Sequence, residues 1–380
     1  KILELDDKNA DALHLLGVIA HQRGKFEDAV KLISMAIEIR PQESLYYLSC
    51  GNSFRELKEL DSAILNYEGA IKFKADCVDA HHGMGLILFQ KNKFKESLES
   101  FNNAIKYKSD FADAFYNRGV LLQYCNDLIN AKISFERAIL INENYSEAYA
   151  NLGSLYELEG MLDLALKFYG KAIEINKNYA TAYFNRANIL KKLKLYSEAL
   201  NDYSRSIEID PKLFPALYNQ GNLLRELKRY VEALKSYESA IIINPQSAEA
   251  YCNKALSLHE LKNFSKAIEF FNIALEINPN FAEAYYNRGS SLEKLKQLEA
   301  ALESYERAYE LNPEIDYLLG IKQQVKLTLC DWTGLSETLD RLAYGVNLQK
   351  PVVHALTALL FFDNPELHLL SSKTYVSSKF

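Results

Sequence analysis

Residues 146–179 read SEAYANLGSLYELEGMLDLALKFYGKAIEINKNY, and the spacing of small residues in this stretch decides the fold. Gly153 is followed twelve residues later by Ala165 and seven residues after that by Ala172. Small residues let the backbones of neighbouring helices approach closely, because the distance between helix axes depends on the side chains at the contact. The stretch therefore predicts two antiparallel helices of about 14 residues joined by a short turn.

The same spacing recurs along the chain with a period of 34 residues and no change of register. In every repeat the second and third small positions carry only alanine or serine. A constant period of this length indicates a helical repeat array, in which each repeat buries its apolar face against its neighbours. The first small position is held by Gly17, Gly51, Gly85, Gly119, Gly153, Ala187, Gly221, Ala255 and Gly289.

Larger residues also recur at fixed places. In every repeat but the first, an aromatic residue stands four residues after the second small position, as Tyr169 does in the quoted stretch. Proline is expected to end the second helix of five repeats, because its ring is incompatible with a helix interior. These residues are Pro41, Pro211, Pro245, Pro279 and Pro313. The middle repeats carry other residues there, and we expect their turns to be less sharply specified.

This combination of small residues, aromatic residues and proline resembles the tetratricopeptide repeat (TPR) family. The resemblance covers residues 10–315 and implies an all-α fold, a right-handed superhelical solenoid of nine helix–turn–helix repeats. We expect residues 1–9 to be the tail of a preceding, truncated repeat and residues 316–346 to form capping helices. Residues 347–380 would begin a following, catalytic-domain-like region. The family serves many partners, so the fold alone does not define a function.

Composition narrows the class of partner. The formal net charge is −6 and no run of five basic residues occurs, which disfavours nucleic acid as a partner. The longest apolar stretch, residues 351–362, is too short to cross a bilayer, so we expect no membrane partner. Five cysteines are scattered without a CxxC pair, which indicates free thiols in a reducing compartment and a cytoplasmic protein. The first residue is Lys1, and we expect the chain to be part of something longer.

Asparagine recurs at one position of the first helix. Counting residue 10 as position 1 of the first repeat, position 6 carries asparagine in six consecutive repeats. Asparagine is unfavourable inside a helix because its amide competes with the backbone, so packing alone gives no reason to repeat it. An amide row is able to pair with the backbone of an extended peptide, and we favour this role over hydrogen bonds between repeats. We call Asn117, Asn151, Asn185, Asn219, Asn253 and Asn287 the asparagine row.

Further polar residues share this helix face by the i+3 and i+4 rule. Position 2 is often acidic, and position 9 adds asparagines, so both are candidates for secondary peptide contacts. The alternative for the acids is a solvated helix N-terminus, where negative charge is favoured by the helix dipole. The secondary candidates are Asp79, Asp113, Glu147, Asn188, Asn222, Glu249 and Glu283. Positions 2 and 5 never carry lysine, which argues against a carboxylate clamp for chaperone C-termini.

No residue pattern typical of catalysis occurs within the repeats. The sequence has no HExxH motif, no Cys/His cluster and no glycine loop suited to phosphate. Acidic residues are numerous but spread as on any solvated helical surface. We therefore predict no catalytic residue, no metal and no cofactor in this chain.

The residues after the repeats carry a second resemblance. Cys330-Asp331-Trp332, Pro351 and the segment Asp363-Asn364-Pro365-Glu366-Leu367 are similar to the junction in the protein O-GlcNAc transferase and SPINDLY-like glycosyltransferase family. There a TPR array leads into a two-lobed GT-B catalytic domain. The resemblance implies an acceptor-recognition arm of an enzyme that uses a UDP-sugar donor, and polypeptide clients with Ser/Thr acceptors. The alternatives are a generic cap at the end of the array and a free-standing TPR scaffold that assembles protein complexes. A second copy of the chain, forming a homodimer, is a further candidate partner.

Overall fold

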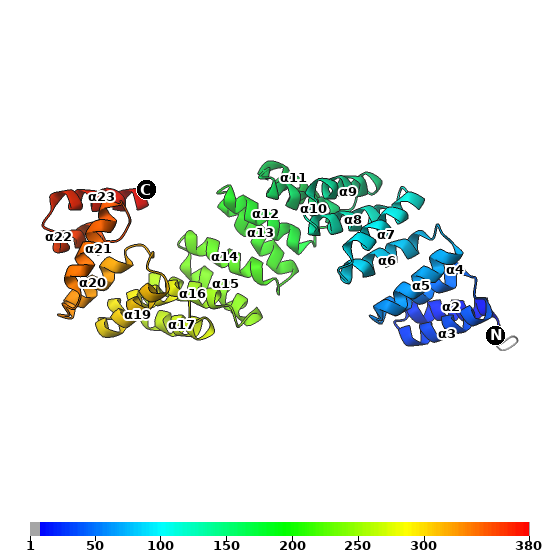
Figure 1. The fold of residues 1–380 in the computed structure, drawn as a ribbon, viewed down its shortest axis with the longest axis horizontal. Helices are drawn as coiled ribbons and strands as arrows, with labels where there is room; N and C mark the ends of the chain where they lie inside the picture. The colour runs from blue at the N-terminus through cyan, green and yellow to red at the C-terminus, as the bar shows by residue number, and fades with distance from the viewer. Residues whose placement is uncertain (1–7, 380) are drawn as a thin grey trace. The chain divides into compact units, whose positions relative to one another are not determined.

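The computed structural model describes residues 8–379. Within these residues the chain forms twenty-two helices and no strand, which confirms the predicted all-α fold of paired helices (Figure 1). The chain divides into two compact units, Lys1–Ile189 and Leu190–Phe380, which we describe separately. The expected repeat tail falls mostly on residues 1–7, outside the described part. Asn9 caps the first helix, because its side chain accepts a hydrogen bond from the Ala12 N–H at 3.0 Å.

The first unit holds the helices of repeats one to five and the start of repeat six. Each repeat contributes one helix of 13 residues followed by one of 14 residues. These helices are α2 (Ala10–Gln22), α3 (Phe26–Ile39), α4 (Ser44–Glu56), α5 (Leu60–Phe73), α6 (Val78–Gln90), α7 (Phe94–Tyr107), α8 (Ala112–Tyr124), α9 (Leu128–Ile141), α10 (Ser146–Leu158) and α11 (Leu162–Ile175). The boundary between the units lies within α12 (Ala180–Lys192).

The second unit completes the repeats and adds four C-terminal helices. Its repeat helices are α13 (Tyr196–Ile209), α14 (Phe214–Glu226), α15 (Tyr230–Ile243), α16 (Ala248–Glu260), α17 (Phe264–Ile277), α18 (Ala282–Lys294) and α19 (Leu298–Leu311). The helices after the repeats are α20 (Leu318–Thr328), α21 (Leu335–Asn347), α22 (Ala355–Phe361) and α23 (Pro365–Lys379).

A residue with left-handed backbone joins the two helices of every repeat. It is Gly24 (φ 74°) in the first repeat and Lys58 (φ 61°) in the second. After Lys58, the N–H of Glu59 donates to the Phe54 carbonyl at 3.0 Å, a bond that closes the C-terminus of a helix. The equivalent residues are Asn92, Asn126, Gly160, Lys194, Lys228, Lys262 and Lys296.

Proline does not set the end of the second helix. Helix α3 ends at Ile39, two residues before Pro41, and α5 ends at Phe73, two residues before Ala75. Arg40 and Lys74 come directly after these two helices and no longer have helical backbone angles. Each N–H still donates at 2.9 Å to the carbonyl of the third small residue of its repeat, Ala36 or Ala70. The repeats without proline therefore turn at the same place, which differs from our expectation.

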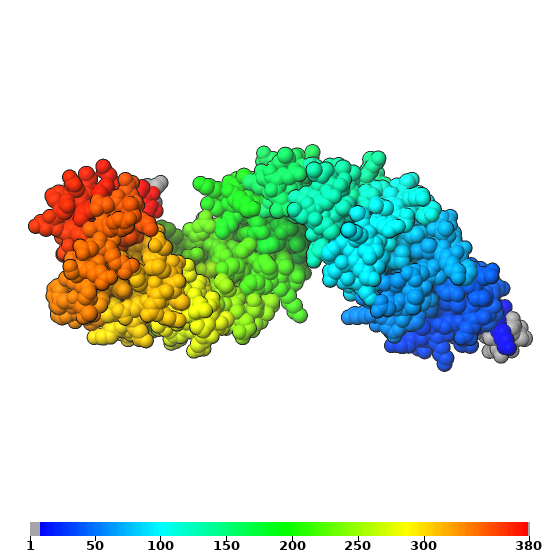
Figure 2. All heavy atoms as spheres, in the orientation of Figure 1, coloured from blue at the N-terminus to red at the C-terminus, as the bar shows by residue number. Residues whose placement is uncertain are grey.

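The small residues pack against buried rings as the spacing predicts. Phe135 is fully buried, and a Cβ added to Gly119 would lie 2.6 Å from the Cε1 atom of its ring. In the second unit, a Cβ on Gly221 would lie 2.7 Å from the Tyr237 ring. The ring of the second helix therefore fills the space that glycine leaves on the first helix. Figure 2 shows side chains filling the space between successive helix pairs within each unit.

The C-terminal helices cover the last repeat. Leu318 and Val325 of α20 are buried in one cluster with Tyr305 and Ala308 of α19, as the predicted apolar stripe requires. Leu342, Val346, Ala358, Phe361 and Leu367 belong to a further buried cluster that joins α21, α22 and α23. Figure 2 shows these helices (orange and red) as one continuous mass. Residues 347–379 thus pack together with the capping helices.

Candidate functional site

The asparagine row lies on the first helices of six repeats. In the first unit Asn117 lies on α8, Asn151 on α10 and Asn185 on α12. In the second unit Asn219, Asn253 and Asn287 lie on α14, α16 and α18. All six side chains are half-buried. Each unit therefore carries three asparagines of the row.

In the first unit the amide nitrogens reach back to the preceding repeat. Asn117 Nδ2 lies 2.9 Å from His82 Nε2, and Asn151 Nδ2 donates to Tyr116 Oη at 3.3 Å. Burial lowers the pKa of His82, which favours the neutral imidazole that accepts from the Asn117 amide. Hydrogen bonds between repeats, the less favoured alternative, are therefore present at Asn117 and Asn151.

In the second unit the amide nitrogens are also engaged. Asn253 Nδ2 donates to Tyr218 Oη and to Asn222 Oδ1, both at 2.9 Å. Asn287 Nδ2 donates at 2.7 Å to the backbone carbonyl of Glu283, one turn earlier. These bonds fix the orientation of the amide groups.

The amide oxygens are used differently. Among residues 8–379, the Oδ1 atoms of Asn117, Asn151, Asn253 and Asn287 accept no hydrogen bond. An amide oxygen has capacity for two hydrogen bonds. Each of these four side chains therefore offers an oriented acceptor to a donor from a ligand, such as a peptide N–H.

The asparagines at position 9 pair with the buried tyrosines of their own repeats. Tyr67 Oη donates to Asn52 Oδ1 at 2.7 Å, and Tyr237 Oη donates to Asn222 Oδ1 at 2.8 Å. Where the ring is phenylalanine, position 9 is apolar, as in Phe135 and Val120. Position 9 therefore satisfies a buried hydroxyl. The sequence contained this covariation, and our assignment of Asn222 to peptide contact did not use it.

Several acids at position 2 already have local partners. Asp113 accepts a hydrogen bond from Tyr145 Oη at 2.8 Å, and Glu147 accepts one from Ser146 Oγ at 2.9 Å. Glu249 accepts one from Ser247 Oγ at 3.2 Å. Burial and the Asp113 carboxylate raise the pKa of Tyr145, which keeps this phenol protonated as a donor. The other two candidates, Asp79 and Glu283, are exposed in the first turns of α6 and α18.

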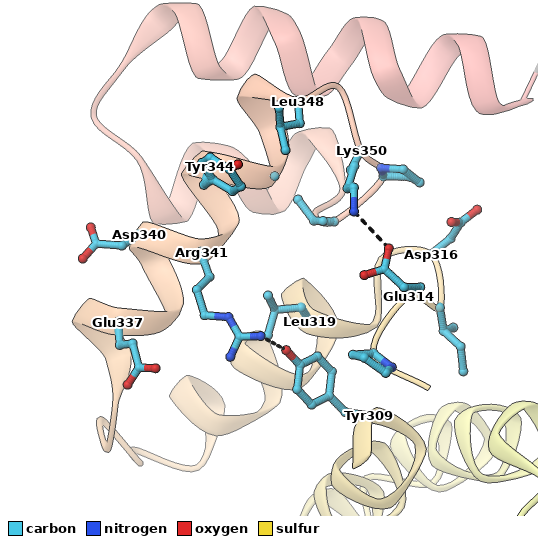
Figure 3. A pocket seen from close by; sticks show the side chains of 15 residues that line it. Tyr309, Glu314, Asp316, Leu319, Glu337, Asp340, Arg341, Tyr344, Leu348 and Lys350 are labelled. Carbon is cyan, nitrogen blue, oxygen red and sulfur yellow. Dashed lines mark hydrogen bonds and ion pairs between the residues drawn. The ribbon is translucent and has the colours of Figure 1, made fainter. Parts of the chain in front are cut away.

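A cleft of about 550 Å³ lies between the last repeat and the cap (Figure 3). Arg341 of α21 donates to Tyr309 Oη of α19, and Lys350 pairs with Glu314 at 3.1 Å. Both basic side chains thus connect the cap to the end of the repeats. We interpret these contacts as attachment of the cap to the array.

The described part of the chain contains no group of three or more His, Cys, Asp or Glu side chains placed to hold a metal ion. Over the same residues no helix is both long and apolar enough to cross a membrane. The five cysteines are free: Cys50, Cys77 and Cys252 are buried, while Cys125 and Cys330 are exposed.

Models of known families match nearly all of the repeat region. Models described as "Tetratricopeptide repeat" match residues 1–44, 112–145, 146–179, 180–213, 203–235, 248–281 and 282–315. A model described as "TPR repeat" matches residues 51–91, 85–123 and 221–262. No curated protein sequence matches the chain.

Two solved structures with TM-scores above 0.5 share the fold of this chain. PilF of Pseudomonas aeruginosa has a TM-score of 0.51 at 19% identity, covering 57% of this chain and 98% of its own. The C-terminal part of a TPR repeat-containing protein from Cytophaga hutchinsonii has a TM-score of 0.51 at 16% identity, covering 60% and 94%. YrrB, described as a TPR protein with an unusual peptide-binding site, has a TM-score of 0.42 at 26% identity, covering 50% and 97%.

Proposed function

Because this chain belongs to the tetratricopeptide repeat family, we propose that it is a protein-binding scaffold whose asparagine row holds an extended polypeptide. The observation that carries the proposal is the set of open Oδ1 acceptors on Asn117, Asn151, Asn253 and Asn287. Their amide nitrogens are held by the protein itself, so the oxygens are oriented before a ligand arrives. Such preorganisation lowers the entropic cost of binding.

The chemistry of this face favours backbone recognition over side-chain recognition. An extended peptide presents N–H groups at regular intervals, and an amide oxygen accepts from any of them regardless of the neighbouring side chain. The asparagines recur every 34 residues on equivalent helices, so two successive repeats of each unit offer the same acceptor. The proposed clients are therefore polypeptides with an extended segment rather than one defined sequence.

Replacing Asn117, Asn151, Asn253 and Asn287 together by alanine is expected to weaken peptide binding at least tenfold. Each hydrogen bond contributes about 0.5–1.5 kcal/mol, and tenfold corresponds to about 1.4 kcal/mol. The measurement is fluorescence anisotropy with labelled, acetylated and amidated peptides of Ser, Thr and Ala, about ten residues long. Asn201→Ala, an exposed asparagine on the second helix α13, is the matched control and should leave the affinity unchanged.

Circular dichroism shows whether the quadruple variant keeps its helices. Unchanged affinity in a folded quadruple variant would contradict the asparagine row as the binding element. A parent protein that binds none of these peptides would contradict the proposed function itself.

A finer proposal is that the chain is the acceptor-recognition arm of a protein glycosyltransferase that transfers a sugar from a UDP-sugar to Ser/Thr. It rests on the resemblance around Cys330, Asp331 and Trp332 and on the segment near Pro365. The comparisons lend it no support. The test is sugar transfer to a bound peptide by a protein that contains this chain. Peptide binding without transfer would favour the alternative, a free-standing scaffold for assembling protein complexes.

A further inference from the structure

The second unit holds a half-buried cation that lacks a counter-ion. Arg225 lies in the last turn of α14, and its Nε atom is buried without a hydrogen-bond acceptor among the described residues. No carboxylate of residues 8–379 lies within ion-pair distance of its guanidinium. A buried donor without a partner carries a desolvation cost that a ligand is able to relieve. The partial negative charge of the helix C-terminus favours the cation, but it supplies no acceptor for Nε.

The guanidinium lies next to the asparagine row. Arg225 is one helical turn after Asn222, and Asn222 is bonded to Asn253 of the neighbouring repeat at 2.9 Å. The Arg225 charge acts on two neutral side chains, Tyr237 and Cys252. Burial raises the pKa of Tyr237 and of Cys252, and the positive charge of Arg225 acts against burial at both groups. The guanidinium therefore faces hydroxyl, thiol and amide groups, while the carboxylates of Glu249 and Glu283, which also act on Cys252, form no ion pair with it.

The nearest acid in sequence is held elsewhere. Glu226 pairs with Lys191 Nζ at 3.3 Å and accepts from Tyr196 Oη at 3.3 Å. Lys191 has the same place in repeat six as Arg225 has in repeat seven. The lysine of the preceding repeat thus removes the carboxylate that would otherwise be closest to Arg225.

Repeat two provides an internal comparison. Asn52, Arg55, Glu56 and Tyr67 have the same spacing as Asn222, Arg225, Glu226 and Tyr237. In both repeats the tyrosine hydroxyl donates to the asparagine, at 2.7 and 2.8 Å. Arg55, however, donates to Glu56 at 3.2 Å. The same local sequence therefore allows the glutamate to neutralise the arginine, as it does in repeat two. In repeat seven Arg225 keeps an unpaired charge because Glu226 pairs with Lys191 instead.

We infer that Arg225 binds a carboxylate of the bound polypeptide, supplied by an Asp or Glu side chain beside the segment held by the asparagine row. A carboxylate has two oxygens that match the guanidinium fork, and charge-assisted bonds of this kind are stronger than neutral ones. The inference rests on the proposed function and adds a preference for acidic clients. The carboxylate at the end of a polypeptide has the same chemistry, and the experiment distinguishes the two sources.

The test compares two labelled peptides, both acetylated and amidated, about ten residues long, with a central Asp or a central Asn. The parent protein should bind the Asp peptide about ten- to a hundredfold more tightly, as a charge-assisted contact of this strength implies. Arg225→Gln should remove this preference without changing the affinity for the Asn peptide. Arg55→Gln is the matched control and should keep the preference, because the Arg55 charge already has a partner.

A second variant tests the role of the neighbouring repeat. Lys191→Gln releases Glu226, which is then able to neutralise Arg225, so the preference for the Asp peptide should fall. A preference that survives Arg225→Gln would overturn the inference. Equal binding of both peptides by the parent would overturn it while leaving the proposed function intact, whereas no binding of either peptide would overturn the proposed function.

The third arm is the Asn peptide with a free C-terminal carboxylate. If this peptide binds tenfold more tightly than its amidated form, loses that gain in Arg225→Gln, and a central Asp gives no counterpart gain, the result supports a site that recognises the C-terminal carboxylate of a polypeptide. It overturns the assignment to an Asp or Glu side chain.

Discussion

Replacing Phe135 by alanine is expected to lower the free energy of unfolding by about 3–5 kcal/mol. The ring is fully buried between the two helices of repeat four, in a cluster with Leu122, Ala131 and Ala150. The backbone of α8 cannot move in to fill the space, because Gly119 already touches the ring. Most of the cavity should therefore remain open, and urea unfolding monitored by circular dichroism should show the loss.

Three companion variants separate this effect from a general sensitivity to substitution. Phe73→Ala, at a partly exposed ring on α5, should cost about 1 kcal/mol or less. Phe135→Tyr should cost about 1–3 kcal/mol, because its hydroxyl would meet Val120 and find no acceptor. Adding Val120→Asn should restore part of that loss by recreating the pair seen at Tyr67 and Asn52. A Phe135→Ala protein as stable as the parent would contradict the assignment of this ring to the core.

Gly320→Ala is expected to destabilise the C-terminal cap by about 1–3 kcal/mol. A Cβ at this position of α20 would lie 2.8 Å from the carbonyl oxygen of Val352 and 3.0 Å from the Cα of Val353. These are backbone atoms, so no rotation of a side chain relieves the contact. The Gly320 N–H also donates to the Val352 carbonyl at 3.0 Å, and pushing this segment away weakens that bond.

Gly170→Ala is the matched control on α11. The nearest atom to its added Cβ would be Arg186 Nη1, 3.9 Å away, so the substitution has room. Alanine in a helix interior is favoured over glycine by about 0.5–1 kcal/mol, and this variant should be slightly more stable than the parent. Thermal melts of both variants give the comparison. Equal melting of the Gly320→Ala protein and the parent would show that the segment near Val352 is not held against α20.

Much of the fold follows from the sequence because its determinants are local and periodic. Small residues such as Gly119 and Ala131, spaced twelve apart, require two helices that approach closely, and Phe135 marks the ring between them. The pairing of Tyr67 with Asn52 is also visible as covariation along the sequence, although its meaning depends on knowing where the hydroxyl points. The ends of the second helices are not predicted correctly from proline, because repeats without proline end their second helix at the same position as the others.

The tertiary structure decided which polar groups remain available. From the sequence alone, we favour peptide binding over hydrogen bonds between repeats for Asn151 and Asn253. Their amide nitrogens are in fact engaged within the protein while their oxygens stay open. Likewise Glu226 follows Arg225 directly but pairs with Lys191. Such choices depend on the direction of each side chain and the position of the adjacent repeat, and sequence spacing fixes neither.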